Sequence, residues 1–228
     1  MPLASASGLT LHNTAAVPVS FKGRKALKLT ISPEAEARMA AARPAGGQTK
    51  GGGKKGGPGA GEANRLDLLA IVEGAEFSNG TIEVDLAGEP GAGAAGGARG
   101  FVGVAFRVQP DRKIYDCFYL RPTNGRADDQ ERRNHSAQYI SHPEHTWFKL
   151  REATPSRYES YVDIQPAEWI HVKIEVDGER ARLFVNGNAQ PTLIVNDVKS
   201  GAGAKGGVAL WFEGSTVAHF ANLKITPR

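Results

Sequence analysis

The sequence predicts an all-β protein, built as an antiparallel β-sandwich. Through the last two thirds of the chain, short segments that alternate apolar and polar residues follow one another almost without a break. Turn-forming pairs such as Asp177-Gly178 and Asn186-Gly187 separate them, and only one run in the chain is typical of a helix. Many short strands, regular turns and little helix favour a sandwich or a barrel. We expect residues 1–228 to form one domain, a length that such folds often reach.

The first third of the chain divides into strands, one helix and a low-complexity segment. Residues 1–31 contain three short alternating segments, which predict strands. Residues 33–42 are the helix-like run, and Pro33 suits the first turn of a helix. Residues 43–64 hold mostly Gly, Lys, Pro and Ala, which predicts a flexible insertion; a basic tether for an anionic partner is the alternative. Residues 88–99 predict a second, Gly/Ala-rich loop between two strands.

Alternation assigns the residues of each strand to a core face and an opposite face. In residues 114–121 one apolar set belongs to the core, with Asp116 as an exception that the pattern does not explain. The core set is Ile114, Phe118 and Leu120, and the opposite set is Tyr115, Cys117, Tyr119 and Arg121. Residues 146–151 predict a strand with Trp147 on the non-core face, and Trp211 points outward from its own strand. One sheet should therefore carry aromatic rings and Arg side chains on its non-core face.

The composition excludes several classes of protein. The net charge is +4, and apart from a few lysines in residues 43–64 the positive charges are spread among acidic residues, so we expect no nucleic-acid partner. No apolar run reaches the roughly 18 residues of a membrane helix, so we expect no membrane partner. No signal peptide is recognisable: the protein is cytoplasmic if Met1 is native, and periplasmic or extracellular if a signal was removed. The single cysteine, Cys117, excludes an internal disulfide and a cysteine-based metal cluster.

Four segments resemble the concanavalin A-like lectin/glucanase superfamily, especially its bacterial laminin-G-like and 3-keto-disaccharide hydrolase domains. They are FSNGTIEVDL (77–86), GFVGVAFRV (100–108), WIHVKIEVDGERARLFVNG (169–187) and GVALWFEGSTVAHFANLKI (207–225). The last two pair a strand that ends in Val-Asn-Gly with a closing Phe-x-Asn-Leu-x-Ile. The resemblance implies an antiparallel jelly-roll β-sandwich of the concanavalin A-like type. It leaves the function open, because this superfamily contains lectins, hydrolases and adhesion modules.

The carboxylates and histidines of the sequence do not predict a catalytic or metal site. Retaining glucanases of this superfamily need two carboxylates on one strand face, about 5 Å apart. Here Glu83 and Asp85 share a face, but Glu89 falls in the predicted loop, so a polar outer face is the favoured interpretation. Neither the three histidines nor the acidic residues of the 128–145 region have the spacing of a known zinc or calcium motif. We therefore expect no catalytic residue, metal or other cofactor.

The segment 115–151 and Trp211 hold the candidate binding residues. Pyranose rings pack their C–H groups on aromatic faces, while Arg, Asn, Gln and His can hydrogen-bond sugar hydroxyls. The predicted ligand-binding residues are Tyr119, Arg121, Asn134, His135, Gln138, Tyr139, Trp147 and Trp211. The first hypothesis is therefore a module that binds a glycan or oligosaccharide on a concave sandwich face.

The sequence leaves two alternative functions open. A glycoside or keto-sugar hydrolase would need a base such as His135 beside an acid, namely Asp116, Glu131 or Glu144. A structural or adhesion module would use the same sandwich without a polar pocket. A carbohydrate is the expected ligand, while the sugar and the oligomeric state are left open.

Overall fold

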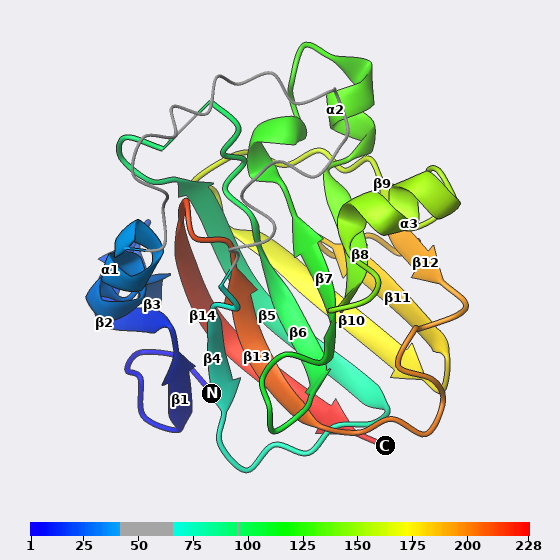
Figure 1. Ribbon diagram of the computed structural model, residues 1–228, viewed down its shortest axis with the longest axis horizontal. Coiled ribbons are helices and arrows are strands. Elements are labelled where there is room, and N and C mark those ends of the chain that lie inside the picture. The colour runs from blue at the N-terminus through cyan, green and yellow to red at the C-terminus, as the bar shows by residue number, and fades with distance from the viewer. Residues whose placement is uncertain (42–65, 95) are drawn as a thin grey trace.

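The computed structural model describes residues 1–41, 66–94 and 96–228, which form two seven-stranded antiparallel sheets packed face to face (Figure 1). The first sheet has the order β1 (Leu9–His12), β4 (Leu69–Val72), β13 (Gly207–Phe212), β6 (Val102–Val108), β7 (Tyr115–Leu120), β8 (Ala137–His142), β9 (Glu159–Ser160). The second has the order β12 (Leu193–Val195), β11 (Arg180–Val185), β10 (Ile170–Asp177), β5 (Gly80–Pro90), β14 (Thr216–Pro227), β3 (Arg24–Ile31), β2 (Thr14–Phe21). The predicted all-β jelly-roll sandwich is confirmed.

The four helical segments are short and lie outside the sheets. They are α1 (Pro33–Ala41), η1 (Pro122–Asn124), α2 (Gln130–Asn134) and α3 (Trp147–Ala153). Helix α1 confirms the predicted helix that begins at Pro33. None of the helices in the described part of the chain is long and apolar enough to cross a membrane.

Helix α3 corrects the prediction of a strand at residues 146–151. Thr146 has an extended backbone and precedes the helix, and its carbonyl accepts a hydrogen bond from Leu150 N at 3.0 Å. Six residues of alternating polarity are too few to separate a strand from a short helix with one buried residue. In a helix, Trp147 and Arg151 are four residues apart and share a face, as they also would in a strand. Trp147 and Arg151 are therefore neighbours although the element is a helix and not the predicted strand.

Two predicted boundaries also differ from the structure. Strand β5 continues to Pro90, and Glu89 pairs with Val217 of β14, so the loop predicted at residues 88–99 starts later. A Cβ on Gly88 would lie 2.3 Å from the carbonyl oxygen of Gly100, which shows how closely the two ends of this loop approach. The insertion predicted at residues 43–64 lies outside the described residues.

The core between the sheets contains one buried polar pair that the sequence pattern did not explain. Asp116 is fully buried on β7 and accepts a hydrogen bond of 2.6 Å from the hydroxyl of Tyr139 on β8. Phe118 and Leu120 are buried as predicted, but Ile114 is 45% exposed because it precedes the strand. Asp116 is thus an interior residue with a partner, since a buried carboxylate needs hydrogen bonds.

A buried arginine ties together the loops at one end of the sandwich. Arg107 is 1% exposed and has a left-handed backbone, with φ of 54°. Its guanidinium donates to the carbonyl oxygens of Ser78, Gly178 and Gly201 at 2.8–3.1 Å. It also donates to the hydroxyl of Ser200 at 2.9 Å. One side chain thereby joins the loops before β5, after β10 and before β13.

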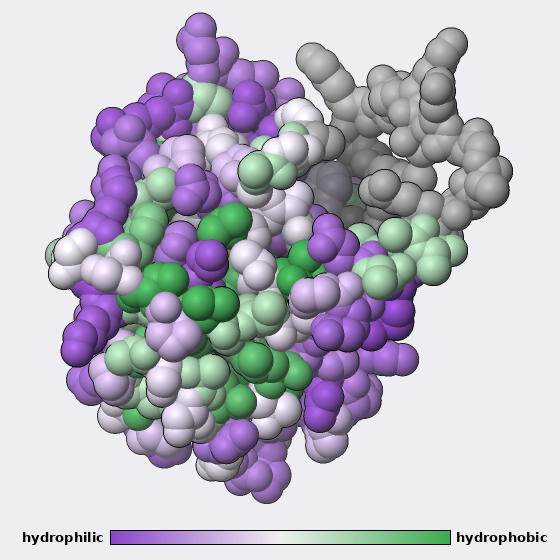
Figure 2. All heavy atoms as spheres, turned by 90° about the vertical axis from the view of Figure 1, so that its left-hand side faces the viewer, coloured by the Kyte–Doolittle hydropathy of each residue, from purple (hydrophilic) through white to green (hydrophobic). Residues whose placement is uncertain are grey.

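The edge formed by β1 and β2 presents scattered apolar side chains. Met1, Leu11 and Val17 are 43%, 37% and 47% exposed. Figure 2 shows this side of the molecule, where hydrophobic residues lie among polar ones. Exposed apolar residues of this kind are common on protein surfaces.

Gly103 on β6 allows the neighbouring strands of the first sheet to pack closely. A Cβ on Gly103 would lie 2.2 Å from the carbonyl oxygen of Phe118 and 2.6 Å from Cα of Tyr119. No side chain can occupy this position without a shift of the backbone of β7.

We predict that Gly103→Ala lowers the free energy of unfolding by about 2–3 kcal/mol in urea denaturation, because the added methyl group meets backbone atoms. Gly203→Ala is the control, since a Cβ there meets nothing within 4 Å. It should change stability by less than about 0.5 kcal/mol. Equal stability of Gly103→Ala and the wild type would contradict the close packing at this position.

Candidate functional site

Three of the candidate residues on the strands, Tyr119, Gln138 and Trp211, line up in one row across the outer face of the first sheet. The register pairs Trp211 with Gly103, Gly103 with Tyr119, Tyr119 with Gln138, and Gln138 with Glu159. Directly opposed residues in antiparallel strands project to the same face. The row therefore crosses β13, β6, β7, β8 and β9 on the side of the sheet that faces away from the other sheet.

Aromatic rings form the base of this row. The rings of Trp211 and Tyr119 meet above Gly103 with centroids 4.9 Å apart, and Phe101 lies 5.9 Å from Tyr119. The indole nitrogen of Trp211 donates to the hydroxyl of Tyr115 at 3.3 Å, and this hydroxyl donates to Asp67 at 2.6 Å. Trp211 and Tyr119 are each only 2% exposed. They are a fixed, buried base rather than the accessible surface that the sequence predicted.

Arg121 follows β7 and is buried among neutral acceptors. Its guanidinium donates to the carbonyl oxygen of His135 at 2.7 Å, to the hydroxyl of Tyr119 at 2.8 Å and to Gln138 Oε1 at 3.2 Å. It also lies over two rings, 5.0 Å from Tyr119 and 5.6 Å from Phe101. Burial lowers its pKa from the ordinary value, although the nearby Tyr119 acts in the opposite direction. No carboxylate of the described residues accepts a hydrogen bond from this guanidinium.

Glu159 is the acidic residue at the end of the row. Its two oxygens accept hydrogen bonds from Arg151 at 3.0 and 2.7 Å, and Nδ1 of His135 lies 2.8 Å from Oε2. Burial alone would raise the pKa of Glu159, but His135 and Arg151 outweigh it and lower the pKa to about 2. This carboxylate is therefore ionised at neutral pH and cannot serve as a general acid there.

Trp147 joins this cluster from helix α3. The guanidinium of Arg151 lies 4.8 Å from the centre of its ring, one helical turn away. The indole is half-buried, and the side chains of His135 and Arg151 are 16% and 24% exposed. These three side chains form the accessible rim beside the buried row.

The structure brings six of the eight predicted residues to this end of the outer face. They are Tyr119, Arg121, His135, Gln138, Trp147 and Trp211. Tyr139 does not belong with them: it pairs with Phe118, points between the sheets and bonds Asp116. Adjacent strand residues face opposite sides, so Gln138 and Tyr139 cannot share a face. Asn134 is exposed at the end of α2, where it accepts a hydrogen bond from Gln130.

None of the carboxylates proposed for a hydrolase forms the ion pair of His135, which is with Glu159, and Glu131 is exposed on α2. Asp116 lies between the sheets, and Glu144 pairs with Lys149 at 3.6 Å. Glu159, which does contact His135, was not a predicted site residue. The only sequence feature that could have indicated Glu159 was the strand-like pattern of residues 158–163. Its contact with His135 depends on the pairing of β8 with β9, which the sequence does not show.

The carboxylates Glu83 and Asp85 lie on the outer face of the second sheet, far from this row. Asp85 accepts hydrogen bonds from Arg24, His171 and Asn222 at 2.8–2.9 Å. This is the polar outer face that the alternation predicted. No group of three His, Cys, Asp or Glu side chains suited to a metal ion occurs within residues 1–41, 66–94 and 96–228.

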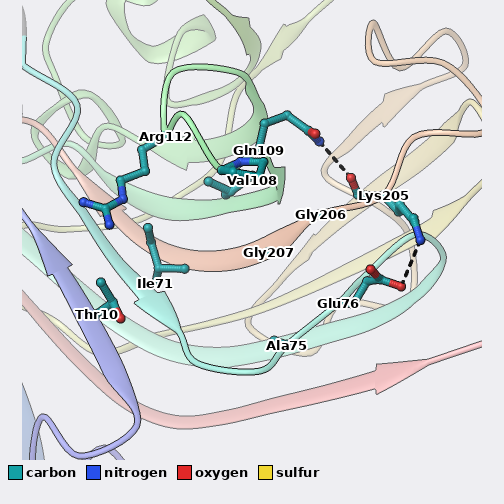
Figure 3. A pocket seen from close by; sticks show the side chains of 11 residues that line it. Thr10, Ile71, Ala75, Glu76, Val108, Gln109, Arg112, Lys205, Gly206 and Gly207 are labelled. Atoms are coloured by element: carbon teal, nitrogen blue, oxygen red, sulfur yellow. Dashed lines mark hydrogen bonds and ion pairs between the residues drawn. The ribbon is translucent and has the colours of Figure 1, made fainter.

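A hollow of about 500 Å³ lies at the opposite end of the same outer face. Ile71 forms part of its floor and pairs with Ala209, two residues before Trp211 on β13. Figure 3 shows Arg112 and Lys205 on opposite sides of it. Lys205 is paired with Glu76 at 3.4 Å. The outer face thus extends from the Trp147 rim to this hollow.

Two antiparallel sheets stacked face to face in this order define a protein of the concanavalin A-like jelly-roll class. Within that class, the chain belongs to the family of 3-keto-alpha-glucoside-1,2-lyase-like domains, whose model matches residues 60–226. This confirms the resemblance found in the sequence. No curated protein sequence matches the chain.

Solved structures share the fold at low sequence identity. The carbohydrate-binding module CBM66 of Bacillus subtilis is 14% identical, with a TM-score of 0.53, and the match covers 95% of this chain and 93% of that one. A Bacillus subtilis protein of unknown function with a galectin-like fold is 11% identical, with a TM-score of 0.53, covering 100% and 95%. Similarities at this level of identity support the architecture alone.

We predict that Glu159→Gln lowers the free energy of unfolding by about 2 kcal/mol at pH 7. The folded state holds the pKa of Glu159 near 2, below its ordinary value of 4.5, so the ionised form favours folding. The difference in the free energy of unfolding between variant and wild type should therefore be largest above pH 4.5 and disappear as the pH falls toward 2. Urea denaturation across this range measures it.

Glu144→Gln is the matched control for this measurement, since the Glu144 side chain is 77% exposed. It should have little effect at any pH. A Glu159→Gln difference that does not change between pH 5 and pH 2 would contradict the assignment.

Proposed function

We propose that the protein binds a carbohydrate at the end of the first sheet's outer face where Trp147, His135 and Arg151 form the rim. The proposal rests on one observation: an accessible indole, an imidazole and guanidinium groups converge over a single sheet face. A sugar ring offers C–H groups for the indole and hydroxyls for the polar side chains. This combination fits a pyranose better than it fits an apolar or a nucleic-acid ligand.

The rim is held in place before any ligand arrives. Arg151 is fixed by two hydrogen bonds to Glu159 and packs on Trp147, so neither side chain is free to change rotamer cheaply. The buried row of Tyr119, Gln138 and Trp211 supports it from below. Pre-positioned groups lose less conformational entropy on binding, which favours affinity for a small polar ligand.

The test is a glycan-array screen followed by calorimetry with the best ligand. We predict that Trp147→Ala weakens binding about tenfold or more, because the stacking surface is lost. Trp169→Ala is the matched control: this tryptophan is also half-buried but belongs to the second sheet's side, where it bonds the carbonyl oxygen of Phe21. It should leave the Kd unchanged. Absence of glycan binding by the wild type, or equal loss in both variants, would contradict the proposal.

A second candidate is elimination from a 3-keto glucoside, which the family description favours. A ketone at C3 acidifies the proton on C2, so a base can remove it and form an enolate. The enolate then expels the glycosidic oxygen from C1 with the bonding electrons, and this oxygen takes up a proton from the protonated base. His135 is the candidate base, because Glu159 holds its ring at 2.8 Å and Arg151 lies beside it. A guanidinium at this position would stabilise the enolate that forms.

We predict that His135→Gln lowers elimination from a 3-keto glucoside at least 100-fold, measured by the absorbance of the enone product. His171→Gln is the control, since His171 lies on the second sheet beside Asp85. If the wild type binds the sugar and forms no enone, the catalytic candidate is excluded and the binding function remains.

A further inference from the structure

Three arginines gather at the upper end of the outer face, next to the rim. Arg99 lies just before β6, Arg121 follows β7, and Arg132 belongs to α2, which stands at the top of the molecule beyond the end of β7 (Figure 1). Hydrogen bonds connect their segments. Thr123 donates to the carbonyl oxygen of Arg99, while Arg121 donates to that of His135, whose own N–H donates to Arg132.

Among the described residues, no carboxylate accepts a hydrogen bond from any of the three guanidinium groups. Arg99 donates to the carbonyl oxygens of Gly96 and Ala98 at 2.8 and 3.0 Å. Arg121 bonds a carbonyl oxygen, a hydroxyl and an amide oxygen, while Nε of Arg132 is buried without a partner. Throughout the described part of the chain, no ion pair includes any of the three.

Within the described residues, no direct ion pair therefore compensates the positive charges of this cluster. Burial lowers the pKa of Arg99, and repulsion from Arg132 and Arg121 lowers it further. The buried carboxylate of Glu159 acts on Arg121 without bonding it, and it is already shared by Arg151 and His135. Like charges held together in a partly desolvated place cost free energy, which a bound anion would recover.

We propose that the carbohydrate recognised at this site carries an anionic oxygen group, a carboxylate or a sulfate, which binds between Arg99 and Arg132. This inference rests on the proposed carbohydrate-binding function and names the chemistry of its ligand. Arg99 and Arg132 are partly exposed and can donate to the anion directly. Arg121 is 5% exposed and contributes its charge from behind. Planar guanidinium forks match the geometry of oxyanions, and their hydrogen bonds to a charged acceptor are strong.

The experiment compares matched sugars by calorimetry: oligosaccharides that end in glucose, in glucuronate and in glucose 6-sulfate, each in 50 and in 500 mM NaCl. We predict that at least one of the two anionic ligands binds at least tenfold more tightly than the neutral one at low salt. High salt should reduce this preference, because ions screen the charges. Comparing the affinities for the glucuronate and the glucose 6-sulfate ligands distinguishes a preference for a carboxylate from one for a sulfate.

The variant Arg99→Gln/Arg132→Gln should abolish the preference and leave the affinity for the neutral sugar unchanged. Its Tm should equal or exceed that of the wild type, since repulsion is removed. The control, Arg180→Gln/Arg182→Gln, removes the same charge from exposed positions of β11 on the second sheet and should keep the preference.

Two negative results have different meanings. Equal affinity for neutral and anionic sugars, with binding that still depends on Trp147, would overturn the anion site and leave the proposed function intact. Failure of all three sugars, and of every glycan on the array, would overturn the proposed function itself.

Discussion

The bare backbone at Gly103 is the constraint on which the outer face depends. Because β6 carries no side chain there, Trp211 and Tyr119 meet across it with their rings 4.9 Å apart. The register then aligns Gln138 and Glu159 with this aromatic pair. A side chain at position 103 would separate β6 from β7 and displace Arg121, which follows directly on β7.

Two buried charges beside this row have opposite electrostatic surroundings. Glu159 is held by Arg151 and His135, so its charge is fully compensated. Arg121 has three neutral acceptors, so its charge still acts on its neighbourhood. The carboxylate of Glu159 fixes the geometry of the rim, whereas the guanidinium of Arg121, which no carboxylate of the described residues bonds, adds positive potential to it. This end of the first sheet thus combines side chains held in fixed positions with a positive electrostatic potential.

Alternation within strands was sufficient to predict the sandwich and the faces of Tyr119 and Trp211, because side-chain direction on a strand is a local property. The same alternation places Tyr139 on the opposite face from Gln138, so including both neighbours in one predicted site was wrong. Glu159 and Arg99 were missed because their roles depend on contacts between distant segments. Trp147 was placed on a strand because a helix of seven residues is too short to show its period clearly.

Because Arg107 anchors the loops at only one end of the sandwich, the loops at the two ends differ in how well they tolerate changes in sequence and length. By joining the loops before β5, after β10 and before β13, it makes the geometry of one end depend on a single side chain. The loops at the other end, around α2 and α3, do not share that anchor. They can therefore be exchanged or lengthened to accept other ligands while the anchored end continues to hold the two sheets in register.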